Sequence, residues 1–295
     1  MGLGLGLGIW WPIQTSIIPG LLKALCARAT YCENKLCTTA TLEEIAAVRY
    51  TAPVLPTGLL ADYPGASAAY SLRNLIDTTT NVVRVRRSSD NTEQDFTATE
   101  VTDGTLTTFT GANDGFVTTW YDQSGNSNDA VQATAISQAK IIDNGFLTYI
   151  NGTTPSLYFE QSERRHYAFT GASYPISFFA VKKGINNTQT YQYTIGTAST
   201  RGLRAVDENY ADNSPFAVSN LYVNNQLGET NSLQYHSINY CNANGDTILD
   251  RIGTSRTSSA YSTGMYITEF IVYPTDQSAN RTGIETNINT EYTIY

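Results

Sequence analysis

One stretch of seven residues, WYDQSGN, carries side chains of the types that can bind a sugar. Trp120 and Tyr121 offer aromatic faces on which a sugar ring can stack, while Asp122 and Asn126 can hydrogen-bond its hydroxyls. These four residues are our candidate carbohydrate-binding residues. The block also fits a purely structural turn, because Asp122 can accept backbone N–H bonds and Gly125 tolerates a positive φ.

Metal chemistry has less support in the sequence. The chain has only 2 His, and neither an H-x-x-x-H nor an H-E-x-x-H spacing occurs. Asn113, Asp114 and Asp122 offer the oxygen ligands that Ca²⁺ prefers, but no twelve-residue calcium loop surrounds them. We therefore expect no cofactor and no metal site, with a Ca²⁺ site in these loops as the open alternative.

Three of the four cysteines, Cys26, Cys32 and Cys37, cluster near the start of the chain, and Cys241 stands alone. Their C-x5-C and C-x4-C intervals differ from the C-x2-C pairs of zinc sites. Four cysteines are also too few for a dense disulfide framework in a chain of 295 residues. Free, partly buried thiols are the favoured interpretation, and one disulfide within the cluster stays open.

The composition excludes several classes of protein. Charged residues make up 15% of the chain and the formal net charge is −8, whereas a protein that binds a nucleic-acid backbone needs a basic face. The one basic cluster, Arg84, Arg86 and Arg87, alternates as one face of a strand does. The apolar runs are too short or too broken for a membrane helix. We expect neither nucleic acid nor a membrane span.

Short strand-like runs separated by Gly- and Asn-rich turns predict an all-β sandwich. The expected strands are residues 82–86, 116–121, 156–159, 176–182, 191–195, 221–223 and 265–273. Two helices are expected beside them. One covers residues 66–76, with an apolar stripe at Ala69, Leu72, Leu75 and Ile76, and the other covers residues 281–292, with Ile284, Ile288 and Tyr292 in register.

Residues 1–60 differ from the rest of the chain. No charged side chain precedes Lys23, and Pro12 and Pro19 interrupt the apolar run, so we expect no cleaved secretory signal. We interpret this segment, with helices at 21–29 and 38–48, as one that docks the chain into an assembly; an ordinary helical subdomain is the alternative. The expected anchor residues are Leu3, Leu5, Leu7, Ile9, Trp10 and Trp11.

Two sequence blocks are more specific than the composition. They are AYSLRNLI followed by VRVRRSSDNTEQDF, at residues 69–76 and 83–96, and GFVTTWYDQSGNSNDA, at residues 115–130. Both resemble the catalytic-domain family of fungal α-L-arabinofuranosidase B, in the version found in bacteriophage tail and other virion proteins. Residues 264–276 look like the last strand of that family. The resemblance covers residues 61–295 and implies a concanavalin-like (jelly-roll) β-sandwich, with residues 1–60 as a small, partly helical anchoring segment.

The resemblance also implies two catalytic carboxylates, one of which has no counterpart here. The family's nucleophile stands in a Val-Asp-x-Glu-Asn pattern, and Glu208 in VDEN is the nearest match, one residue short. The family's acid is the aspartate of an Ile-Gly-Gly-Asp loop, where this chain has Ser255. A serine cannot supply that proton near neutral pH, so Asp207 or Asp250 would have to replace it.

These observations together favour a non-enzymatic bacteriophage virion protein: a head fibre, tail fibre or capsid decoration with an outward lectin-like domain for host glycan attachment. The expected partners are other virion proteins, copies of itself in a symmetric oligomer such as a trimer, and a host surface glycan. The expected location is the virion, assembled in the host cytoplasm. The alternative is a glycoside hydrolase of α-L-arabinofuranosidase type acting on host polysaccharide. A decoration protein without any ligand is a third hypothesis.

Overall fold

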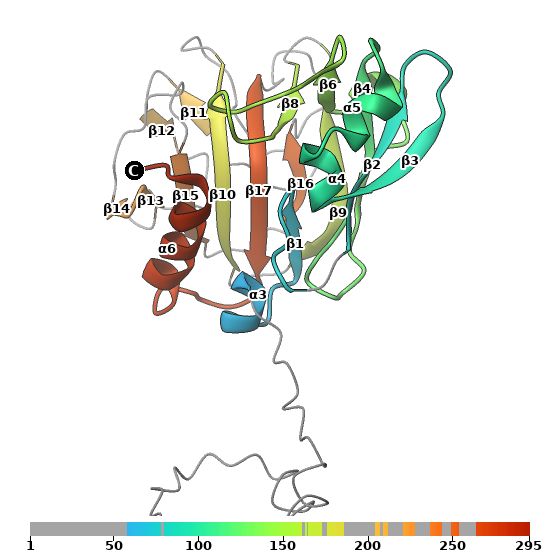
Figure 1. Cartoon of the computed structure of the whole chain (residues 1–295). Helices are drawn as coiled ribbons and strands as arrows, with labels where there is room; N and C mark the ends of the chain where they lie inside the picture. The colour runs from blue at the N-terminus through green and yellow to red at the C-terminus, as the bar shows by residue number, and fades with distance from the viewer. Residues whose placement is uncertain are drawn as a thin grey trace, which may run out of the picture. The chain divides into compact units, whose positions relative to one another are not determined.

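The structure is a computed structural model in which the chain folds into strands with few helices (Figure 1). It describes residues 58–77, 80–160, 163, 165–172, 176–185, 204–206, 209–211, 221–227, 237–243, 249–253 and 264–295. All of these belong to the unit Pro56–Tyr295. The predicted helices at 21–29 and 38–48, the six anchor residues and the three clustered cysteines lie outside the described residues, so these predictions and the domain boundary at residue 60 stay predictions.

Strands account for most of the described elements. They are β1 (Ala68–Ser71), β2 (Asn81–Arg87), β3 (Glu93–Thr97), β4 (Gly115–Trp120), β5 (Ala130–Val131), β6 (Lys140–Asp143), β7 (Phe146–Leu147), β8 (Leu157–Phe159), β9 (His166–Ala172), β10 (Ile176–Gly184), β11 (Arg204–Val206), β12 (Asn209–Ala211), β13 (Leu221–Val223), β14 (Gln226–Leu227), β15 (Ser237–Ala243), β16 (Leu249–Gly253) and β17 (Met265–Tyr273). The helices are α3 (Leu59–Asp62), α4 (Ala98–Thr102), α5 (Thr105–Thr110), the 3₁₀ turn η1 (Ala135–Ser137) and α6 (Arg281–Tyr292).

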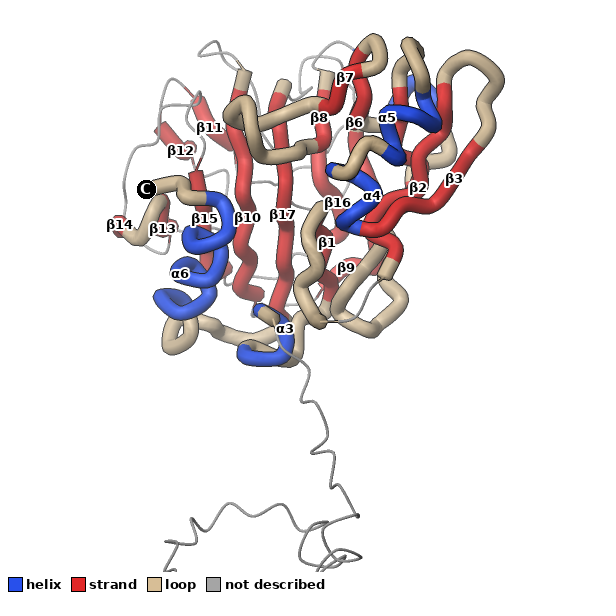
Figure 2. The backbone as a smooth tube through the Cα atoms, in the orientation of Figure 1, coloured by secondary structure: helices blue, strands red, loops and turns tan. Residues whose placement is uncertain are grey.

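Most strands pair antiparallel along the path β14-β13-β15-β10-β17-β8-β6-β4-β5-β9-β16, whereas β11 and β12 pair only with each other. Strand β1 joins this sheet beside β17, and β2 links β3 to β4. Figure 2 shows β10 and β17 as long central strands, with α6 in front of the neighbouring part of the sheet. The described residues therefore form an antiparallel β-sandwich, which confirms the predicted all-β class.

Two apolar clusters lie on opposite faces of β10 and β17. Along β10, Phe178 and Ala180 belong to the inner cluster between the layers, whereas Phe179 and Val181 belong to a second cluster that α6 covers. This alternation follows from the two-residue period of a strand. Because both faces are buried, residues 178–181 (FFAV) form a continuous apolar run.

Most predicted elements are confirmed. Helix α6 spans the predicted residues and buries Ile284, Ile288 and Tyr292. The six expected strands other than residues 191–195 correspond to β2, β4, β8, β10, β13 and β17, and residues 191–195 lie outside the described residues. The predicted strand with the alternating arginines is β2, where Arg84 faces Glu93 and Asp95 and Arg87 faces Asp90.

The helix predicted at residues 66–76 is wrong. Its centre is β1, which pairs with β17 in the register Ala68↔Val272 to Ser71↔Glu269. Ala68 and Tyr70 face the inner cluster and Ala69 faces the second cluster. A strand buried on both faces shows no polar alternation, so its apolar pattern cannot be distinguished from that of a short helix.

Candidate functional site

The predicted sugar-binding block forms a turn that is tied into the fold by its own side chains. Asp122 Oδ1 accepts the backbone N–H groups of Ala69 at 2.8 Å and Ser124 at 2.9 Å, and its Oδ2 accepts that of Asn128 at 3.0 Å. Gly125 has a φ of 86°, as the turn requires. Asp122 thus fastens the turn to β1, which is the structural interpretation of this block.

The other three residues of that prediction are also engaged inside the protein. Trp120 is fully buried, with its ring centroid 5.6 Å from that of Tyr70, so it has no exposed face for a sugar. The Tyr121 hydroxyl donates to Asp95 at 2.7 Å, and the Asn126 amide donates to the Ala66 carbonyl at 2.9 Å. The described contacts therefore support a structural role for this block.

The described residues do not include the full set of candidate catalytic residues. Glu208 and Asp207 lie outside them, and so does the Ser255 position. Asp250 is a backbone position within β16. The nucleophile and its replacement acid therefore stay predictions.

The carboxylates of Asp114 and Asp122, which the sequence offered as Ca²⁺ ligands, contact other groups of the protein. Asp114 Oδ1 accepts the Asn144 backbone N–H at 2.8 Å, and its Oδ2 lies 3.1 Å from the Lys140 ammonium. Within the described part of the chain, no group of three or more His, Cys, Asp or Glu side chains is placed to hold a metal ion. In the same part, no helix is long and apolar enough to cross a membrane.

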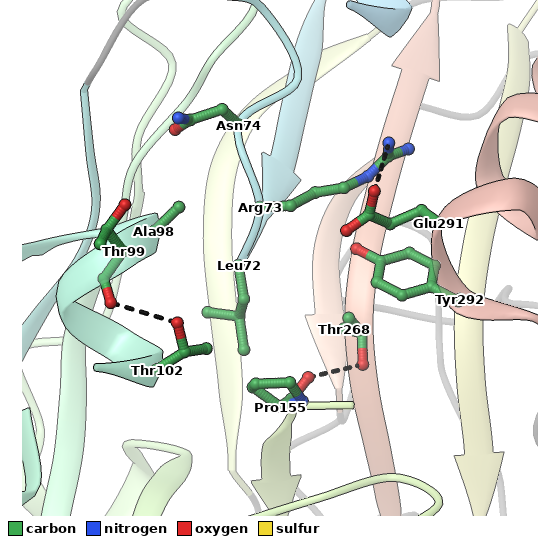
Figure 3. A pocket seen from close by; sticks show the side chains of 10 residues that line it. All are labelled: Leu72, Arg73, Asn74, Ala98, Thr99, Thr102, Pro155, Thr268, Glu291 and Tyr292. Carbon is green, nitrogen blue, oxygen red and sulfur yellow. Dashed lines mark hydrogen bonds and ion pairs between the residues drawn. The ribbon is translucent and has the colours of Figure 1, made fainter. Parts of the chain in front are cut away.

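A groove lined by both polar and apolar residues lies on the α6 side of the sheet (Figure 3). It consists of two adjoining cavities of about 280 and 400 Å³ that share Pro155, Glu291 and Tyr292. Its lining comes from the segment after β1, from α4, from the loop before β8, from β17 and from the end of α6. The lining residues are Leu72, Arg73, Asn74, Ala98, Thr99, Thr102, Asn151, Thr153, Thr154, Pro155, Thr268, Glu291, Tyr292 and Thr293.

Helix α4 forms one wall of the groove because its start is capped. Thr97 and Glu100 form a capping box, in which each side chain bonds the other's backbone N–H. The cap holds the first turn of a helix only five residues long. Thr99 and Thr102 are exposed on this helix and line the groove, and the Thr102 hydroxyl donates to the Thr99 carbonyl at 3.2 Å (Figure 3).

A buried carboxylate anchors the floor of the groove. Glu269, fully buried on β17, accepts hydrogen bonds from Arg73 Nε at 2.7 Å and Nη2 at 3.1 Å. The hydroxyls of Ser71 and Tyr292 each donate to its Oε2 at 2.9 Å. A buried charge needs such partners, and the network links β1, β17 and α6. Burial and, after it, the Glu269 carboxylate raise the pKa of Tyr292 well above its usual range, so its hydroxyl stays a donor.

Glu269 lies on the same face of β17 as Ile271 and Tyr273, and a bulge follows it on the side of Thr268. Val181 pairs with Glu269 while the next residue, Lys182, pairs with Ile267, so Thr268 is an extra residue on β17. Val181 belongs to the cluster under α6, and Glu269 therefore lies on the same side. Thr268 itself donates to the Pro155 carbonyl at 3.0 Å and lines the groove.

The described residues of the groove offer hydrogen-bonding groups for a ligand. Glu269 accepts four hydrogen bonds from Arg73, Ser71 and Tyr292, so it is not available as a nucleophile. The other carboxylate of the groove is Glu291, whose side chain is 49% exposed. Hydroxyl, amide, carboxylate and guanidinium groups around an open cleft can hold a polyhydroxylated ligand.

The residues of this network were not predicted from the sequence, although one feature of the sequence indicated a buried ion pair. Glu269 stands in the middle of an otherwise apolar strand, MYITEFIVY, and a charge at such a position needs a buried partner. Its partner Arg73 is 196 residues away in the sequence. No local pattern connects the two residues.

Comparisons with known proteins find similarity in structure only. No protein-family profile and no curated protein matches the sequence. One similar solved structure is an arabinofuranosidase complexed with arabinofuranosyl-α-1,2-xylobiose, with 15% sequence identity and a TM-score of 0.49. Another is a GH54 α-L-arabinofuranosidase soaked with a cyclic sulfate inhibitor, with 16% identity and a TM-score of 0.45. Each match covers 76% of this chain, which spans 62% of the length of either enzyme.

Proposed function

We propose that this protein is a structural component of a bacteriophage virion whose β-sandwich binds carbohydrate without cleaving it. The observation that carries the binding function is the groove between α4 and α6. Its wall and rim carry the polar side chains of Thr99, Thr102 and Asn74, all of which are exposed residues. Its floor is held in place by the Glu269 network, which lowers the entropic cost of ordering a binding site.

The virion role rests on the sequence. The apolar segment 1–60, without charge before Lys23, suits a docking element, and the blocks at 69–96 and 115–130 resemble virion versions of the arabinofuranosidase B family. In this proposal the segment anchors the protein as a head fibre, tail fibre or capsid decoration. Virion assemblies are symmetric, so copies of the chain associate, for example as a trimer. The groove then contacts a glycan on the host surface.

A glycan array probed with the full chain tests the binding function. We expect at least one glycan to bind, and the double substitution Thr99→Ala/Thr102→Ala to weaken that binding several-fold because the groove wall loses two polar side chains. Thr108→Ala is the matched control, since Thr108 is an exposed threonine of α5 outside the groove lining. A blank array, or equal losses from both variants, would argue against this site. A density map of the intact particle around residues 1–60 tests the virion role.

A further inference from the structure

Arg73 is held rigidly but keeps hydrogen-bonding capacity toward the groove. Nε and Nη2 bond Glu269, and Nη1 and Nη2 each donate to Asn287 Oδ1 at 3.0 Å. A guanidinium has five N–H groups, and these contacts use four. The remaining hydrogen is on Nη1, whose ion-pair partner Glu291 Oε2 lies 3.9 Å away, which is too far for a hydrogen bond.

Glu291 supplies the complementary acceptor. It lies in the last turn of α6 with its side chain 49% exposed, and it forms an ion pair with Arg73. An ionised carboxylate accepts hydrogen bonds at both oxygens. Figure 3 shows the Arg73 and Glu291 side chains meeting at the same side of the groove. A fixed N–H donor and an available carboxylate thus stand 3.9 Å apart.

We propose that Arg73 and Glu291 form a recognition pair for two adjacent free hydroxyl groups, a vicinal diol, on a neutral sugar. One hydroxyl oxygen accepts the remaining Nη1 hydrogen of Arg73, and both hydroxyls donate to the Glu291 carboxylate. Each of these hydrogen bonds involves a charged group, which makes it stronger than a bond between neutral groups. This inference rests on the proposed carbohydrate binding and names the ligand class.

The charge of the site favours a neutral ligand. The positive charge of Arg73 is offset by Glu269 directly beneath it, and Glu291 adds a further negative charge at the surface. An acidic sugar or a phosphate would therefore meet net repulsion. Leu72, Ala98 and Pro155 supply apolar surface in the same groove, against which the C–H groups of a sugar ring can pack.

Saturation-transfer NMR on the full chain tests the pair. The probes are the methyl pyranosides of glucose, galactose and mannose and methyl arabinofuranoside, each with its di-O-methyl analogue at the diol, together with methyl glucuronide. We expect at least one neutral glycoside to bind. Methylation of its diol, or Glu291→Gln, should weaken it about tenfold or more. Glu93→Gln is the matched control, because Glu93 is an exposed glutamate outside the groove lining. Circular dichroism checks that each variant folds.

The outcomes separate this inference from the proposed function. If a neutral glycoside binds but tolerates both Glu291→Gln and methylation of the diol, the recognition pair is wrong and carbohydrate binding stands. Preferential binding of the glucuronide would also overturn the pair. If no probe binds and the glycan array is blank, the pair and the proposed function fail together.

Discussion

Glu269 shows how one residue organises this site. It lies in an apolar strand, fully buried, where an unpaired carboxylate would be strongly destabilising. Arg73, Ser71 and Tyr292 supply its hydrogen bonds, and these residues come from opposite ends of the described chain. Because the network must be complete to be tolerated, it fixes Arg73 in one orientation under the groove. Groove geometry and core stability therefore depend on the same carboxylate.

Glu285 is a second buried carboxylate, and its contacts are less complete. Its residue is 1% exposed on α6, Arg281 donates to its Oε2, and its Oε1 has no hydrogen-bond partner within the described part of the chain. Burial raises the pKa of Glu285 to about 7, although Arg281 opposes this shift. The proton is thus bound more tightly in the folded protein than in the unfolded chain.

This shift predicts a pH-dependent effect of Glu285→Gln. Since the pKa rises from 4.5 to about 7 on folding, the wild-type protein loses stability as pH increases through this range, and a glutamine does not. We expect the variant to gain about 1–3 kcal/mol of unfolding free energy relative to wild type between pH 5 and pH 8. Urea unfolding at both pH values measures this gain. An identical difference at the two pH values would contradict the prediction.

At the scale of elements, the walls of the groove depend on local helix chemistry. Helix α4 was not among the predicted helices, although the T-x-x-E pattern of residues 97–100 is a recognisable capping box. Threonine-rich segments such as TATEVT have low helix propensity. For this reason the capping box alone did not lead to a predicted helix. The cap therefore contributes much of the stability of such a short helix.

Removing this cap should loosen the groove wall. We expect Thr97→Ala to cost about 1 kcal/mol of unfolding free energy, because the Glu100 backbone N–H loses its acceptor and the capping box is broken. Denaturant unfolding measures the cost, and amide hydrogen exchange of residues 98–102 should accelerate with it. Thr108→Ala, an exposed threonine in α5, is the comparison and should change stability by less. Equal effects of the two substitutions would speak against a capping role.

At the scale of the whole molecule, the proposed virion protein needs both a docking segment and a binding domain. The predicted anchor residues include Trp10 and Trp11, which precede the first charged residue, Lys23. We expect the full chain to form a homo-oligomer and the double substitution Trp10→Asp/Trp11→Asp to shift it toward monomer, because charges oppose burial at an apolar interface. Light scattering at several concentrations measures the mass. A wild-type chain that is monomeric throughout would rule out self-association through this segment.

What the sequence determined by itself was the local pattern: the all-β class, helix α6 from the i, i+4 spacing of Ile284, Ile288 and Tyr292, and the turn in which Asp122 accepts backbone N–H groups. These features depend on neighbouring residues, whose preferences can be read directly. The tertiary structure alone decided that β1 is a strand, because burial on both faces erases its periodicity. The tertiary structure also determined where the groove forms, because Arg73, Glu269 and Glu291 come together only after strands distant in sequence have paired.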